Sequence, residues 1–68
     1  MVKIIVKNIN FGEKQVEIKT GKVEELIKKL RTTDDAVLIV DENGDIYTKD
    51  KKLKDGSTIN MIEVFSGG

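Results

Sequence analysis

The sequence predicts an α+β fold in which one α-helix packs on one face of a mixed β-sheet of four or five strands. Three observations support this prediction. Several short segments alternate apolar and polar residues, which is typical of strands with one buried face. Only residues 22–31 repeat their apolar residues at helical spacing. The elements run strand, strand, helix, strand, short strand, strand, an order that favours a two-layer α+β domain.

The N-terminal part of the chain predicts a β-hairpin. Residues 2–7 are rich in β-branched side chains and form the first expected strand, with Ile5 on its outer side between lysines. Residues 8–12 contain asparagine and glycine and predict a turn. Residues 14–19 predict the returning strand. The side chains that we expect in the core from this hairpin are Val2, Ile4, Val6, Val16 and Ile18.

The helix is predicted over residues 22–31, where apolar residues fall at i, i+3, i+4 and i+7 and form one stripe. Thr20 or Gly21 is the expected N-cap. Acidic residues lie near the first turn and basic residues in the last, an order that complements the helix dipole. The apolar stripe consists of Val23, Leu26, Ile27 and Leu30.

Residues 36–40 are continuously apolar and predict a strand with at least one buried face. The Asn-Gly pair at 43–44 predicts a hairpin turn into a short strand at 46–48. Residues 49–54 are charged apart from Leu53, so we expect a surface loop that this leucine anchors to the core.

The last strand is predicted at residues 59–64, parallel to the first strand and at the centre of the sheet. This arrangement places Ile62 and Val64 on the face away from the helix, where Ile5 is also expected. One of the pairs Val37/Ile39 or Leu38/Val40 would lie on the same face. An apolar patch on an uncovered sheet face is typical of a protein-binding surface. The alternative is that these are isolated exposed apolar residues, which are normal in soluble proteins.

The composition restricts the chemistry that the chain can perform. Its 68 residues include no cysteine and no histidine, so the common nucleophiles, the usual base at neutral pH and a typical zinc site are missing. Twelve basic residues balance 12 acidic ones, without the basic surplus of nucleic-acid-binding proteins. No apolar run approaches the roughly 20 residues of a membrane span. We expect a cytoplasmic monomer that is not an enzyme and has no catalytic residue, metal site, nucleic-acid partner or membrane partner.

The end of the sequence is the strongest functional signal. Glycine is costly to order, so we expect residues 66–68 to form a flexible tail after a domain of residues 1–65. The carboxylate of Gly68 is the candidate functional group. A terminal Gly-Gly also arises by chance or as an appended remnant, so the signal depends on the domain that precedes it.

Together, these features resemble the sulfur carriers of the ThiS/MoaD family, which have a ubiquitin-like β-grasp fold. The resemblance rests on the hairpin, the helix stripe, the segment Leu53-Lys54-Asp55-Gly56 before the last strand, and Ser66-Gly67-Gly68. The chain is also similar to ubiquitin and to small archaeal ubiquitin-like modifiers. The resemblance covers essentially the whole chain, and Phe65 departs from the smaller or aliphatic residue expected there.

The resemblance implies that a ubiquitin-activating-type enzyme uses ATP and magnesium to adenylate the Gly68 carboxylate. Sulfur then displaces AMP, and the thiocarboxylate supplies sulfur for thiamin thiazole or molybdopterin, through thiazole synthase or the large subunit of molybdopterin synthase. The chain itself would bind no cofactor. Gly67, which has no Cβ, would let the backbone pass through a narrow channel. The residues expected to contact the partner are Ile5, Ile62, Val64, Phe65 and Ser66.

Two alternatives remain open at this point. In the first, the chain is a ubiquitin-like modifier that becomes joined to lysines of other proteins through Gly68. In the second, it is a non-catalytic protein-interaction domain and its tail is inert.

Overall fold

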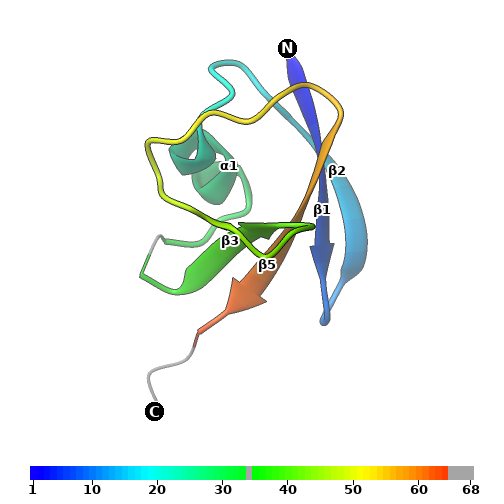
Figure 1. Cartoon of the computed structure of the whole chain (residues 1–68), viewed down its shortest axis with the longest axis vertical. Helices are drawn as coiled ribbons and strands as arrows, with labels where there is room; N and C mark the ends of the chain where they lie inside the picture. Colours follow the sequence, from blue (N-terminus) through cyan, green and yellow to red (C-terminus); the bar gives the residue numbers. More distant parts are fainter. Residues whose placement is uncertain (34, 65–68) are drawn as a thin grey trace.

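The computed structural model describes residues 1–33 and 35–64. Within these residues, five strands form one mixed sheet in the order β2-β1-β5-β3-β4, and one helix covers one face of it (Figure 1). The predicted α+β arrangement is therefore confirmed. The strands are β1 (Val2–Asn8), β2 (Gly12–Ile18), β3 (Val37–Asp41), β4 (Ile46–Tyr47) and β5 (Ser57–Glu63), and the helix is α1 (Val23–Lys29).

The two ends of the described chain meet at the centre of the sheet. β1 and β2 pair antiparallel, and β5 pairs parallel to β1, as predicted. This parallel pairing runs from Ile4 opposite Ser57 to Lys7 opposite Asn60. On its other side β5 is antiparallel to β3. Residues 61–63 of β5 therefore extend beyond the part of the strand that pairs with β1.

The hydrophobic core lies between α1 and the inner face of the sheet. The strand residues that alternate inward and the apolar stripe of the helix supply it, which the periodicity of the sequence predicts. Leu53 is 6% exposed and packs into the same core, so it anchors its loop as expected. The side chains with almost no exposure are Ile4, Val6, Ile18, Val23, Leu26, Ile39 and Ile59.

The N-terminus of α1 differs from the prediction. The N-cap is Lys22, which makes no side-chain capping hydrogen bond, so the prediction of Thr20 or Gly21 is wrong. The amides of Val23 and the next residue each donate a 2.9 Å hydrogen bond to a carbonyl oxygen in loop 49–51. Because the distant loop satisfies these helix amides, no local capping side chain is required.

Gly21 joins the same loop to the start of the helix. Its φ angle is 78°, a left-handed conformation that favours glycine. Its carbonyl accepts a 2.7 Å hydrogen bond from the amide of Leu53, and an added Cβ would lie 3.2 Å from the Leu53 carbonyl oxygen. Both the conformation and the close approach therefore require glycine at this position.

The helix is also shorter than the predicted range of 22–31. Arg31 has φ 58°, the left-handed conformation that ends many helices. Its amide donates to the Lys28 carbonyl at 3.0 Å, and the amide of Thr32 donates to the Ile27 carbonyl at 3.2 Å. These two bonds form a Schellman motif, in which arginine occupies the position that is usually glycine.

The Glu25 carboxylate connects α1 to the end of the preceding hairpin. It accepts hydrogen bonds from the amide of Lys19 at 2.8 Å and from both the amide and the hydroxyl of Thr20 at 2.7 Å. The backbone bond from Lys19 and the bonds from Thr20, with a smaller contribution from the charge of Lys29, lower the pKa of Glu25 from 4.5 to about 2.

This pKa shift predicts a pH-dependent contribution to stability. Because the pKa of Glu25 is lower in the folded state, its contribution is fully present above pH 4.5 and is lost as the pH falls toward 2. We expect Glu25→Gln to lower the melting temperature most at neutral pH. The difference in melting temperature between the variant and the parent should shrink as the pH falls from 4.5 toward 2. Thermal unfolding across the pH range measures this difference, with Glu24→Gln as the control. A difference that stays constant with pH contradicts the prediction.

Candidate functional site

The outer face of the sheet, opposite α1, carries a group of partly exposed apolar side chains. Leu38 lies opposite Ile62 across β3 and β5, and Val40 lies opposite Ile46 across β3 and β4. Residues opposite each other on paired strands project from the same face. Leu38 is 39% exposed, Ile62 48% and Ile46 61%. We call Leu38, Val40, Ile46 and Ile62 the outer patch.

The outer patch includes one of the predicted contact residues, Ile62. Ile5 is half-buried, and its neighbour on β5 is Thr58. Four residues of strand, about 13 Å, separate Thr58 from Ile62, so Ile5 and Ile62 do not touch. Val64 follows β5 and is 45% exposed. The remaining predicted residues, Phe65, Ser66, Gly67 and Gly68, lie outside the described residues.

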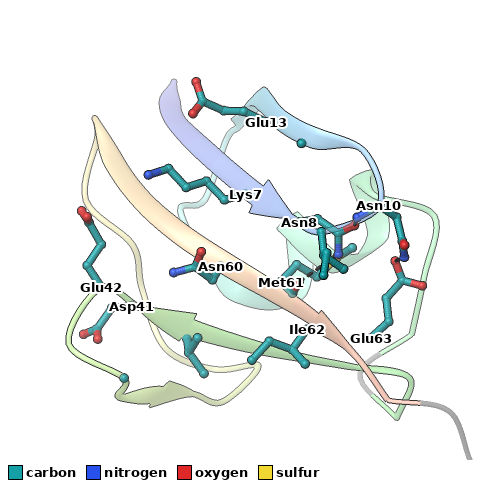
Figure 2. A pocket seen from close by; sticks show the side chains of 14 residues that line it. Lys7, Asn8, Asn10, Glu13, Asp41, Glu42, Asn60, Met61, Ile62 and Glu63 are labelled. Carbon is teal, nitrogen blue, oxygen red and sulfur yellow. Dashed lines mark hydrogen bonds between the residues drawn. The ribbon is translucent and has the colours of Figure 1, made fainter.

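An open groove crosses the outer face beside the outer patch (Figure 2). Val40 and Ile62 contribute apolar lining, as does Ile9, a residue of the β1–β2 turn that is 97% exposed. Acidic residues outnumber basic ones around it, which gives the groove a negative electrostatic potential. The charged lining residues are Lys7, Glu13, Asp41, Glu42 and Glu63.

Asn8 joins the β1–β2 turn to β5 through a buried side chain that is 7% exposed. Its Nδ2 donates to the carbonyl of Met61 at 2.9 Å, and its Oδ1 accepts from the amides of Asn10 at 2.8 Å and Phe11 at 3.4 Å. Sequence reasoning assigned Asn8 to the turn and missed this role. The available signal was its phase, because Asn8 continues the alternation of buried positions along β1.

Two further contacts hold the chain where it leaves β5. Nδ2 of Asn10 donates to Oε1 of Glu63 at 3.0 Å, and the amide of Val64 donates to the carbonyl of Ala36 at 2.7 Å. Figure 2 shows Asn8, the last residue of β1, and Asn10 of the β1–β2 turn beside the last part of β5. The end of β5 is therefore fixed on one side by the backbone before β3 and on the other by the side chains of Asn8 and Asn10.

The described residues gather partly exposed apolar side chains on the outer face of the sheet. Within 1–33 and 35–64, no three or more acidic residues lie in a group that could hold a metal ion. The carboxylate of Asp41 holds the turn that follows it, because its Oδ1 accepts hydrogen bonds from the amides of Asn43 at 2.8 Å and Asp45 at 3.0 Å. Across the same part of the chain, the structure contains no helix that is long and apolar enough to span a membrane.

Comparisons with known proteins agree with this architecture. The model of the ThiS family matches residues 4–68. No curated protein matches the chain. Among solved structures, the chain is similar to the UBL domain of Dsk2 from Plasmodium falciparum, at 19% identity and a TM-score of 0.72, over 93% of this chain and 97% of that one.

It is also similar to a computationally designed protein based on human erythrocytic ubiquitin, at 18% identity and a TM-score of 0.70, over 100% of this chain and 98% of that one. At these identities the structural similarities show the fold alone. They confirm the predicted ubiquitin-like β-grasp class.

Proposed function

The chain belongs to the ThiS family, and we propose that it is a sulfur carrier whose Gly68 carboxylate is adenylated and then converted to a thiocarboxylate. Proteins of this family are small carriers rather than catalysts, and they interact with adenylating enzymes and synthases. One observation carries the proposal. The family match continues through Gly67 to Gly68, the residues whose chemistry the proposal uses.

The proposed chemistry takes two steps. An oxygen of the Gly68 carboxylate attacks the α-phosphate of ATP, and the bond to pyrophosphate breaks. Hydrosulfide then attacks the acyl carbon, AMP leaves with the bonding electron pair, and loss of a proton gives the thiocarboxylate. Adenylation is needed because a free carboxylate has no adequate leaving group. The partner binds ATP and the magnesium ion and supplies the charges that stabilise the adenylyl group during its transfer.

In this proposal the outer patch is the surface that binds the adenylating enzyme. Its apolar centre and the acidic groove beside it fit a partner with an apolar surface and basic side chains around it. Ile62 lies close to the point where the chain leaves β5, so binding here brings the following residues to the partner. Ile5, Val64, Phe65 and Ser66 add contacts around the patch.

We further propose that the protein acts in the cytoplasm and passes its sulfur to thiamin thiazole or to molybdopterin. Its second partner is then thiazole synthase or the large subunit of molybdopterin synthase. Gly67 allows the backbone to enter a narrow active-site channel, because it carries no Cβ. The chain binds no cofactor of its own in this scheme.

Intact-mass spectrometry tests the proposal. The chain is incubated with the family's adenylating enzyme, ATP, magnesium and hydrosulfide, and the expected product has one oxygen replaced by sulfur. A variant that lacks Gly68 is the matched control and should remain unchanged. The proposal requires a free carboxylate on Gly68 in the mature protein, which the mass of protein purified from cells establishes first. Failure of an active enzyme to release pyrophosphate with this chain refutes the proposal.

The same preparations distinguish the two alternatives. A ubiquitin-like modifier would yield digests containing branched peptides, in which the acyl carbon of Gly68 is joined to a lysine amine of another protein. An interaction domain with an inert tail would keep its function after Gly67 and Gly68 are deleted. The carrier proposal predicts neither result.

A further inference from the structure

The final residues of β5 are held differently on their two sides. Pairing with β1 ends at Lys7 opposite Asn60, whereas pairing with β3 continues to Val37 opposite Glu63. Beyond Asn60, the contacts on the β1 side come from Asn8, the last residue of β1, and from Asn10 of the β1–β2 turn, and the one that Asn8 makes is buried. The direction of this end of the strand therefore depends on a side chain as well as on the backbone.

The two polar atoms of the Asn8 side chain have separate tasks. Oδ1 accepts from two amides of the adjoining turn, at Asn10 and Phe11, and so holds the turn. Nδ2 donates to the Met61 carbonyl and so holds β5. Because the side chain is buried, water does not readily replace the second bond. A substitution that removes only the donor can separate the two tasks.

The direction of β5 at its end determines where the residues after it can reach. Four residues, 65–68, follow Val64, and an extended chain of that length spans at most about 14 Å. With so short a reach, the direction in which the chain leaves the sheet determines the volume open to the Gly68 carboxylate. A misplacement of about 1 Å in a reacting group can cost up to ~100-fold in rate.

We propose that Asn8 is a positioning residue. Its amide fixes the direction in which the chain leaves β5, so that the Gly68 carboxylate meets the α-phosphate when the outer patch is bound to the enzyme. This inference rests on the proposed function and deepens it. Asn10 reinforces the effect through its more exposed bond to Glu63.

The test compares Asn8→Asp with the parent in pyrophosphate release by the adenylating enzyme. Aspartate keeps an acceptor for the turn but places an oxygen where Nδ2 faces the Met61 carbonyl. We expect kcat to fall about tenfold and KM to change by less than about twofold, since the outer patch is intact. If the buried aspartate prevents folding, Asn8→Ser, which also lacks the amide donor, takes the place of Asn8→Asp in the test.

Gly21→Ala is the matched control, because it strains the fold near Val2, at the end of β1 opposite the turn. At a temperature where all variants are folded, it should leave kcat unchanged. Hydrogen exchange at the Val64 amide provides a readout independent of the enzyme, and we expect it to be about tenfold faster in Asn8→Asp. Equal kcat in Asn8→Asp and Gly21→Ala overturns the positioning role and leaves the carrier function standing. Absence of pyrophosphate release with the parent overturns both.

Discussion

Ile62→Asp is expected to weaken binding to the adenylating enzyme by about thirtyfold or more, the effect of losing roughly 2 kcal/mol at the centre of an interface. The substitution places a charge within the outer patch, directly opposite Leu38, and adds to the acidic charge around the groove. The fold should tolerate it. Ile62 is 48% exposed and faces away from the core, and substitutions of this kind usually change stability by about 0.5 kcal/mol or less.

Titration calorimetry with the purified enzyme measures the binding, and the melting temperature checks the fold. Lys28→Gln is the matched control, because it changes the net charge by the same amount at an exposed position of α1, on the opposite side of the sheet from the outer patch. Unchanged binding in Ile62→Asp would show that this patch is not the docking surface. An unfolded variant would show that Ile62 supports the core.

Ile59→Ala is expected to have the largest effect on stability. Ile59 is 1% exposed in the central strand, where it lies opposite Val6 of β1 and Asp41 of β3. Removing a buried isoleucine to alanine costs about 2–5 kcal/mol. A domain of this size has roughly 3–10 kcal/mol in total. A large share of the molecules should therefore be unfolded at physiological temperature.

Urea denaturation followed by circular dichroism measures this loss. Ile59→Val is the conservative control, and we expect it to cost about 0.5–1.5 kcal/mol. If alanine costs no more than valine, the core must close around the missing atoms, and Ile59 does not contribute to stability as its burial indicates.

Periodicity predicted the elements and the buried faces because both depend on neighbours in the sequence. The alternation along β1 and the stripe of α1 identify Ile4, Val6, Val23 and Leu26 as core without any knowledge of the sheet order. The hairpin turns were equally readable from their asparagine and glycine residues. The usual handedness of crossover connections indicated that the helix returns the chain beside the first hairpin, and the last strand was expected parallel to the first at the centre of the sheet.

Long-range contacts were not readable in the same way. The register of β1 on β5 places Ile5 beside Thr58 rather than near Ile62, and nothing local specifies that offset. The first amides of α1 bond to a distant loop instead of a capping side chain. The role of Asn8 was missed because asparagine is common in and beside turns. The hydrogen bond from its Nδ2 to the Met61 carbonyl of β5 is a tertiary contact that the local sequence does not indicate. Gly67 and Gly68 lie outside the described residues, so their proposed roles stay predictions.

The parallel pairing of β1 with β5 has a consequence for biosynthesis. β1 is synthesised first, whereas its central neighbour β5 follows only after β2, α1, β3 and β4. Pairings so distant in the sequence form late and slowly compared with local ones. A nascent chain that stops before β5 lacks both the middle of its sheet and Ile62 of the outer patch. A partner that recognises this patch therefore discriminates against unfinished chains without any separate quality-control step.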